Sequence, residues 1–164
     1  MFELTWAKNG TPNTLTGTGD TLIISDLTAT KFNILLGHVI SSSTDINRLS
    51  RFSSNTGNNY ANRYSSNGGA DSTSTSGDTM FTNSTGPQYN EFGIAYFIDI
   101  SGEEKLLISH AVGDSASTGA GTAPDRRETV SKFSVTTNIT AVNGLNSDVG
   151  DYIADTNMSL LGTD

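Results

Sequence analysis

The densest group of ionic side chains lies between a loop of small residues and a predicted strand. In the stretch GAGTAPDRRETVSKF, Asp125, Arg126, Arg127 and Glu128 follow directly after Pro124. A guanidinium group can bind a carboxylate through two parallel hydrogen bonds, and charges are costly to bury unless they are paired. In a strand, Arg126 and Glu128 point to one face and Arg127 to the other.

Two hypotheses explain this ionic cluster. An ion pair across strands could pin the loop to the rest of the domain. Alternatively, Arg126 or Arg127 binds a carboxylate on a neighbouring subunit, because arginine suits bidentate contacts between proteins. The cross-strand pair is the simpler hypothesis and is favoured.

A second segment that could bind a partner is NNYANRYSSNGG, residues 58–69. It mixes Tyr60, Arg63 and Tyr64 with amide side chains such as Asn59 and Asn62. Tyrosine and arginine are enriched at protein interfaces, and aromatic rings among amides can also stack on sugars. Ordinary packing in an edge strand explains the same residues equally well, so interface, glycan site and edge strand stay open.

The sequence contains no recognisable catalytic or metal-binding motif. His38 and His110 fall on the apolar faces of predicted strands, and without a placed carboxylate they make a poor metal site. The chain lacks a Gly-x-Ser-x-Gly elbow, and its Gly-rich stretch GDSASTGAGTAP has no lysine at phosphate-loop spacing. A core or interface role is favoured for the histidines, and neither enzymatic activity nor a cofactor is expected.

Two groups of acidic residues are interpreted as parts of polar turns. Asp148, Asp151 and Asp155 could lend oxygens to Ca²⁺, but their spacing does not match the twelve-residue calcium loop, so a polar turn is favoured. Glu103 and Glu104 follow a predicted turn, and a solvated hairpin end accounts for them better than an acid and base pair.

The composition of the 164-residue chain bounds its class. Charged residues are 16%, below the usual ~25%, and the net charge is −8 with no cysteine. Nucleic acid and anionic membranes are therefore not expected as partners, because both attract clustered lysine and arginine. No signal peptide is visible, so synthesis in the cytoplasm is expected.

Alternation of apolar and polar residues dominates the chain and predicts strands. The strongest segments are residues 31–40, 91–100, 104–112 and 128–135, and Ser101-Gly102 predicts a hairpin turn between the middle two. Shorter strands are expected at Phe2–Trp6, Thr21–Ser25, Asn59–Tyr64, Ile139–Val142 and Met158–Leu161. A helical turn is predicted within residues 43–52, and a solvated loop over Ser65–Asn83. The predicted fold is all-β: one antiparallel β-sandwich domain over residues 1–164, with a jelly-roll arrangement.

Four stretches carry a resemblance to a known group of proteins. They are NNYANRYSSNGGADSTSTS, EFGIAYFIDISGEEKLLISHAVG, STGAGTAPDRRETVSKF and ITAVN…GDYIADTNMSLLGTD. This series, which covers Phe32 to Asp164, resembles small virion structural proteins of marine tailed bacteriophages. One departure is Ser131-Lys132-Phe133, where that pattern has Gly-Lys-Trp, although the aromatic residue is kept.

The resemblance implies a virion component without catalysis. The first expectation is a capsid decoration or minor structural protein that assembles with itself and with other virion proteins through loops and sheet edges. The alternative is a tail or fibre module that binds host glycan, with Tyr60, Arg63 and Tyr64 as contacts. In either case the protein belongs to the virion after synthesis in the host cytoplasm.

Overall fold

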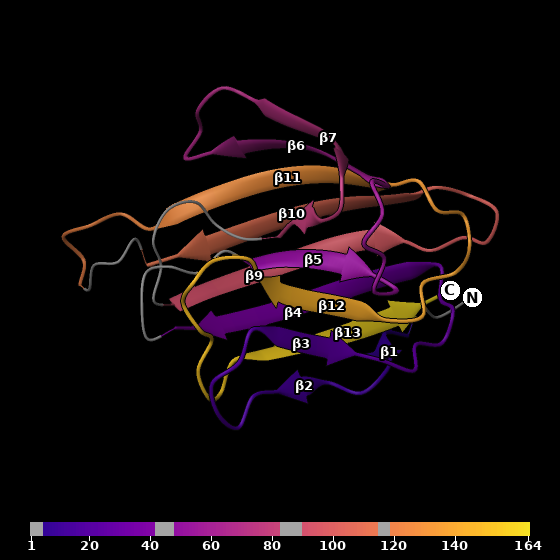
Figure 1. Ribbon diagram of the computed structural model, residues 1–164, viewed down its shortest axis with the longest axis horizontal. Coiled ribbons are helices and arrows are strands. Elements are labelled where there is room, and N and C mark those ends of the chain that lie inside the picture. The colour runs from indigo at the N-terminus through magenta and orange to yellow at the C-terminus, as the bar shows by residue number, and fades with distance from the viewer. Residues whose placement is uncertain (1–4, 42–47, 83–89, 115–118) are drawn as a thin grey trace.

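The computed structural model describes residues 5–41, 48–82, 90–114 and 119–164. These residues form two antiparallel sheets that pack on each other, and the part of the chain they cover contains no helix (Figure 1). The predicted β-sandwich is therefore confirmed, while the jelly-roll arrangement stays a prediction. None of the described residues belongs to a helix that could span a membrane.

The large sheet has the strand order β1-β13-β4-β9-β10-β11-β6-β7, and β2 pairs with β13 beside this path. Its long central strands explain why the alternating segments of the sequence are so prominent. The strands are β1 (Ala7–Lys8), β2 (Asn13–Thr14), β4 (Phe32–Ile40), β6 (Tyr60–Ser66), β7 (Ser72–Gly77), β9 (Asn90–Ile98), β10 (Lys105–Gly113), β11 (Asp125–Phe133) and β13 (Asn157–Thr163).

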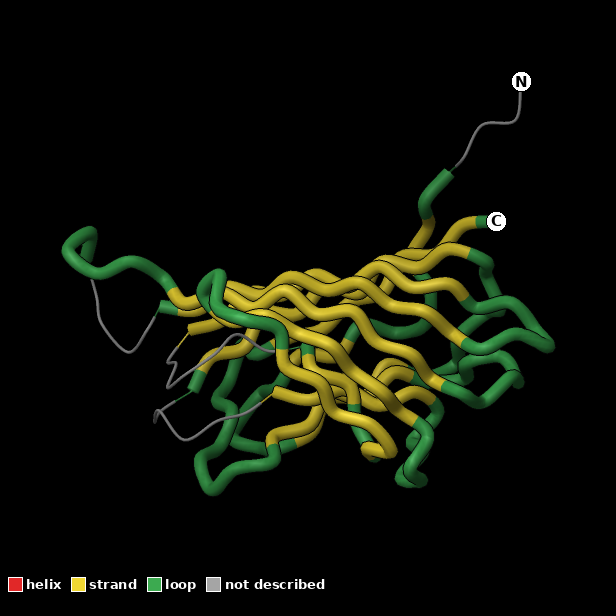
Figure 2. The backbone as a smooth tube through the Cα atoms, turned by 90° about the horizontal axis from the view of Figure 1, so that it is seen from above, coloured by secondary structure: helices red, strands yellow, loops and turns green. Residues whose placement is uncertain are grey.

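The small sheet has the order β3-β12-β5-β8 and lies in front of β9, β4 and β13 in Figure 1. Its strands are β3 (Thr21–Ile24), β5 (Arg48–Phe52), β8 (Met80–Phe81) and β12 (Val142–Asn146). Figure 2 shows the two layers from the side, with the large sheet above. The small sheet covers only one face of the large sheet, so the other face is turned outward.

An aromatic cluster joins the two layers. Phe52 of the small sheet has its ring centroid 4.8 Å from that of Phe97 and 5.7 Å from that of Phe133. Tyr60 stacks on Phe133 with 4.6 Å between ring centroids. All four side chains are buried. Aromatic pairs of this kind add to the stabilisation from burial of apolar area, so the cluster is a main contact between the sheets.

Several predicted elements have different bounds. The helical turn predicted within residues 43–52 is wrong where the structure describes it, because Arg48–Phe52 is β5; residues 43–47 lie outside the described residues. The loop predicted over Ser65–Asn83 contains the edge strand β7 and the short β8. Polar residues in β7 gave no apolar alternation because this strand is largely exposed.

Two short predicted strands also differ from the structure. The strand predicted at Phe2–Trp6 is wrong where the structure describes it, because Thr5 and Trp6 are outside any strand and β1 begins at Ala7; residues 2–4 lie outside the described residues. The strand predicted at Ile139–Val142 is β12, which begins only at Val142. The predicted turn at Ser101-Gly102 is confirmed, since Gly102 has φ +87° and Glu103 N donates to Ile100 O at 3.2 Å.

Two buried tyrosines give the fold a sensitivity to alkaline pH. Tyr60 Oη accepts from Phe52 N at 3.0 Å, and burial raises the pKa of Tyr60 to about 12. Burial also raises the pKa of Tyr152. Because the folded pKa is higher than the ordinary value of 10.0, the contribution to stability is complete below pH 10 and is lost as the pH rises toward 12. For Tyr60 alone we expect a loss of about 3 kcal/mol.

Urea unfolding at a series of pH values from neutral to strongly alkaline measures this loss. Tyr60→Phe should flatten the alkaline slope of the free energy of unfolding, even though it lowers the value at neutral pH. Tyr64→Phe, which changes a tyrosine that is only half-buried, is the control and should keep the slope of the parent protein. A slope unchanged by Tyr60→Phe contradicts the prediction.

Candidate functional site

The outward face of the large sheet is apolar. Side chains from five neighbouring strands meet there in one row, because strand register places Leu161 opposite Ile34, Ile34 opposite Tyr96, Tyr96 opposite Ile108, and Ile108 opposite Val130. Rows on either side add further apolar residues. We call the exposed members of this surface the apolar face: Trp6, Phe32, Phe92, Tyr96, Leu106, Ile108, Val112 and Val130.

The members of the apolar face are open to solvent to an unusual degree. Leu106 and Ile108 are each 54% exposed, and Tyr96 is 47% exposed. Trp6 lies beside Phe32 and Leu106, where these side chains line a shallow groove. In Figure 2 no described segment lies over the middle of this face. A surface of this kind is typical of a protein interface.

The inward positions of the same strands combine core residues such as Phe97 and Leu107 with small and charged residues. In β9 the inward residues include Glu91, Gly93 and Ala95, whereas Phe92 and Tyr96 point outward. His110 is exposed and His38 is half-buried on the outward side, so neither is a core histidine. In β9 the more apolar side is thus the outer one, while the inner side also leaves room for buried ions.

Charged side chains at the border of the apolar face are paired. Arg126 Nη1 lies 3.0 Å from Glu128 Oε1, and Lys132 Nζ lies 3.2 Å from Glu104 Oε2. All four side chains are about half exposed. These two pairs are each neutral, although the chain as a whole has a net charge of −8.

Two contacts describe the ionic cluster after Pro124. The pair between Arg126 and Glu128 runs along β11, and the ion pair across strands stays a prediction. Asn67 adds a cross-strand link: its Nδ2 donates to Asp125 Oδ1 at 2.7 Å, and its Oδ1 accepts from Arg126 N at 2.9 Å. An asparagine amide thus ties the start of β11 to the turn between β6 and β7.

Arg127 points to the opposite side of β11 from its two neighbours, as predicted. Its guanidinium carbon lies 4.9 Å from the ring centroid of Tyr64 and 5.8 Å from that of Phe81, and its Nε donates to Ser66 Oγ at 3.3 Å. Burial lowers the pKa of Arg127. These contacts give Arg127 a role within the subunit.

Two residues predicted as surface contacts are in the interior. Tyr60 is buried in the aromatic cluster, and Asn62 is buried with its Oδ1 accepting from Ser131 Oγ at 2.7 Å. The prediction of ligand contact is therefore corrected for both, because β6 turns these side chains toward the small sheet. Arg63 is exposed and lies 3.7 Å from Asp71. Tyr64 and Asn59 are half-buried.

A buried ion pair lies between the two sheets. Arg48 Nε is 3.1 Å from Glu91 Oε1, and each side chain is at most 6% exposed. The pair is held by charge at this distance, because the two atoms are poorly aligned for a hydrogen bond. Arg48 Nη2 also donates to Thr82 O.

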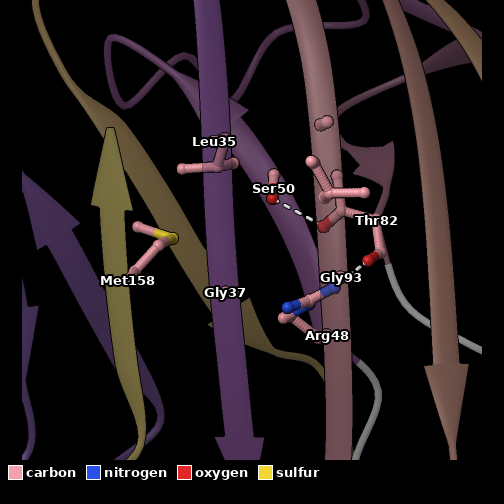
Figure 3. A pocket seen from close by; sticks show the side chains of 9 residues that line it. Leu35, Gly37, Arg48, Ser50, Thr82, Gly93 and Met158 are labelled. Carbon is pink, nitrogen blue, oxygen red and sulfur yellow. Dashed lines mark hydrogen bonds between the residues drawn. The ribbon is translucent and has the colours of Figure 1, made fainter. Parts of the chain in front are cut away.

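Two glycines make room for the guanidinium. Figure 3 shows Arg48 beside Gly37 and Gly93, which face each other in the register of β4 and β9. A Cβ atom at either glycine would collide with the guanidinium nitrogens. The remaining space is about 10 Å³, which admits no more than one water molecule. The site is therefore structural, with no room for a substrate.

Sequence reasoning missed the buried ions. Lys105 is fully buried, with Nζ 3.3 Å from Asp99 Oδ1, although it directly follows two exposed glutamates. Arg48 lies in the segment for which a helical turn was predicted, so its buried position was not expected. The only sign of the buried Arg48 in the sequence was the presence of Gly37 and Gly93 within two apolar strands. Glycine inside a strand often marks a place where another group approaches the backbone closely.

The described part of the chain gathers no three His, Cys, Asp or Glu side chains that could hold a metal ion, and Asp148, Asp151 and Asp155 form no such group. Comparison of the chain with protein-family models, with curated proteins and with solved structures finds no match.

Proposed function

We propose that this chain is a non-enzymatic structural protein of a tailed-phage virion, and specifically a capsid decoration or minor structural protein. The observation that carries the proposal is the apolar face, which is too large and too continuous to be left in water. Its members point away from the core of the sandwich and are not among its buried residues. A surface built in this way serves to bind other proteins.

The source of the partners follows from the resemblance over Phe32 to Asp164. Virion proteins bind one another in fixed arrangements, so the partners of this chain are itself and other virion proteins. The net charge of −8 supports protein partners over nucleic acid. The sequence predicted contacts through loops and sheet edges. Because these segments are polar, we propose that the main contact with other virion proteins is the apolar face.

A tail or fibre module that binds host glycan is the second candidate. One observation favours it: a hollow beside the apolar face is lined by Arg63, Tyr64, Asp71 and His110. This hollow combines an aromatic ring with charged groups, as sugar sites do. It keeps Arg63 and Tyr64 as contacts and excludes the buried Tyr60.

The test is the place and amount of the protein in particles of a phage that encodes it. We expect many copies on the head, and Ile108→Glu should reduce incorporation by about tenfold or more, because it places a charge in the contact. Ile23→Glu is the matched control, since Ile23 is 43% exposed on a strand of the small sheet. Absence of the chain from purified particles contradicts the proposal. A few copies at the tail, with glycan binding lost in Tyr64→Ala, support the second candidate.

A further inference from the structure

The area of the apolar face matches what a stable dimer needs. Its eight side chains expose on the order of 700 Å² of apolar surface, if a whole aromatic side chain has about 150–250 Å². The largest apolar patch on a monomeric protein is about 300–600 Å², and one side of a standard interface buries about 800 Å². A single partner of similar size can therefore cover the whole face.

The distribution of charge around the apolar face is compatible with an identical chain as the partner. Two copies that each carry −8 repel each other over most of their surface. At the border of the apolar face, Arg126 is paired with Glu128 and Lys132 with Glu104. These two pairs carry no net charge, so they add no repulsion where identical copies meet through this face.

The described surface offers no different patch that could receive the apolar face. Among the ten large apolar residues exposed in residues 5–41, 48–82, 90–114 and 119–164, eight belong to this face. The other two lie elsewhere: Ile23 is in β3 of the small sheet, and Val149 is in the segment that follows β12. Two copies in head-to-tail contact would need two complementary surfaces, whereas a two-fold contact uses the same surface twice.

We propose that a second copy of this chain binds the apolar face, so that two large sheets pack outer face to outer face around a two-fold axis. Such sheets pack about 10 Å apart with aligned strands. Tyr96 and Ile108, at the centre of the row across the sheet, lie near the axis. The inference rests on the proposed function, because it names a second copy of the chain as one partner that binds the apolar face.

The test uses the full chain in solution. Sedimentation across the micromolar range should give a dimer for the parent protein, and Ile108→Glu should weaken the dimer by about 100-fold or more, because each dimer then buries two charges. Ile23→Glu should leave the dimer unchanged. Circular dichroism of both variants checks that the sandwich is folded.

A cysteine substitution provides a second measurement, since the chain has no cysteine of its own. Ile108→Cys should form a disulfide-linked dimer on mild oxidation, and Ile23→Cys should stay monomeric under denaturing conditions. A parent protein that is monomeric throughout, or that forms a trimer or an open-ended aggregate, overturns the inference.

The two proposals can fail separately. A monomer whose Ile108→Glu variant still fails to enter particles overturns the two-fold dimer and leaves the proposed function intact. A dimer that is absent from purified particles overturns the proposed function and leaves the dimer intact.

Discussion

Replacing Arg48 by alanine should lower the free energy of unfolding by about 3–5 kcal/mol. The substitution leaves the Glu91 carboxylate buried without its cation, and it also removes the donor to Thr82 O. An unpaired charge in the interior costs far more than the net contribution of the intact pair. Urea unfolding monitored by the fluorescence of Trp6 or by circular dichroism measures the change.

Arg63→Ala is the matched control for Arg48→Ala. Arg63 and Asp71 are both more than half exposed and 3.7 Å apart, so this substitution should cost less than about 1 kcal/mol. The double variant Arg48→Met/Glu91→Met should lose less stability than either single variant, because no charge is left unpaired. Equal effects of Arg48→Ala and Arg63→Ala would show that the buried pair does not stabilise the sandwich.

The second large effect is expected at Lys105. Its Nζ donates to Glu103 O at 2.8 Å and to Thr136 O at 3.2 Å, besides contacting Asp99 Oδ1. Asp99 Oδ2 in turn accepts from Ile139 N at 3.0 Å. Lys105→Met keeps the length of the side chain but leaves a buried carboxylate without a cation, so we expect a loss of about 3–5 kcal/mol in the free energy of unfolding.

Lys132→Met provides the comparison for Lys105→Met. Lys132 lies on the neighbouring strand, and its ion pair with Glu104 is about half exposed on both sides. We expect a loss below about 1 kcal/mol for this variant. The prediction for Lys105 is refuted if the two lysine variants unfold at the same urea concentration.

The sequence predicted the long strands well because their alternation is regular. The segments 31–40, 91–100, 104–112 and 128–135 correspond to β4, β9, β10 and β11, and the turn at Ser101-Gly102 lies where glycine was expected. Strand β7 was missed because it consists of Ser, Thr and Gly, which are also the residues of loops. Strand β5 was missed because its partner β12 lies about ninety residues further along the chain, beyond any local pattern.

Alternation separates the two faces of a strand but does not decide which face points inward. In β9, Phe92, Ile94, Tyr96 and Ile98 form the more apolar face, yet the structure buries Glu91, Gly93, Ala95 and Phe97. On the buried side Arg48, which comes from a distant strand, occupies the space beside Gly93, and Phe97 packs in the core. The apolar face could therefore be recognised as an outer surface only from the three-dimensional arrangement.

The two buried ion pairs have a consequence for behaviour on heating. Hydration of charged groups becomes less favourable as temperature rises, so the cost of removing Arg48, Glu91, Asp99 and Lys105 from water decreases on warming. These contacts become more favourable in the range where the hydrophobic contribution levels off. The buried ion pairs should therefore help this sandwich to stay folded at elevated temperature.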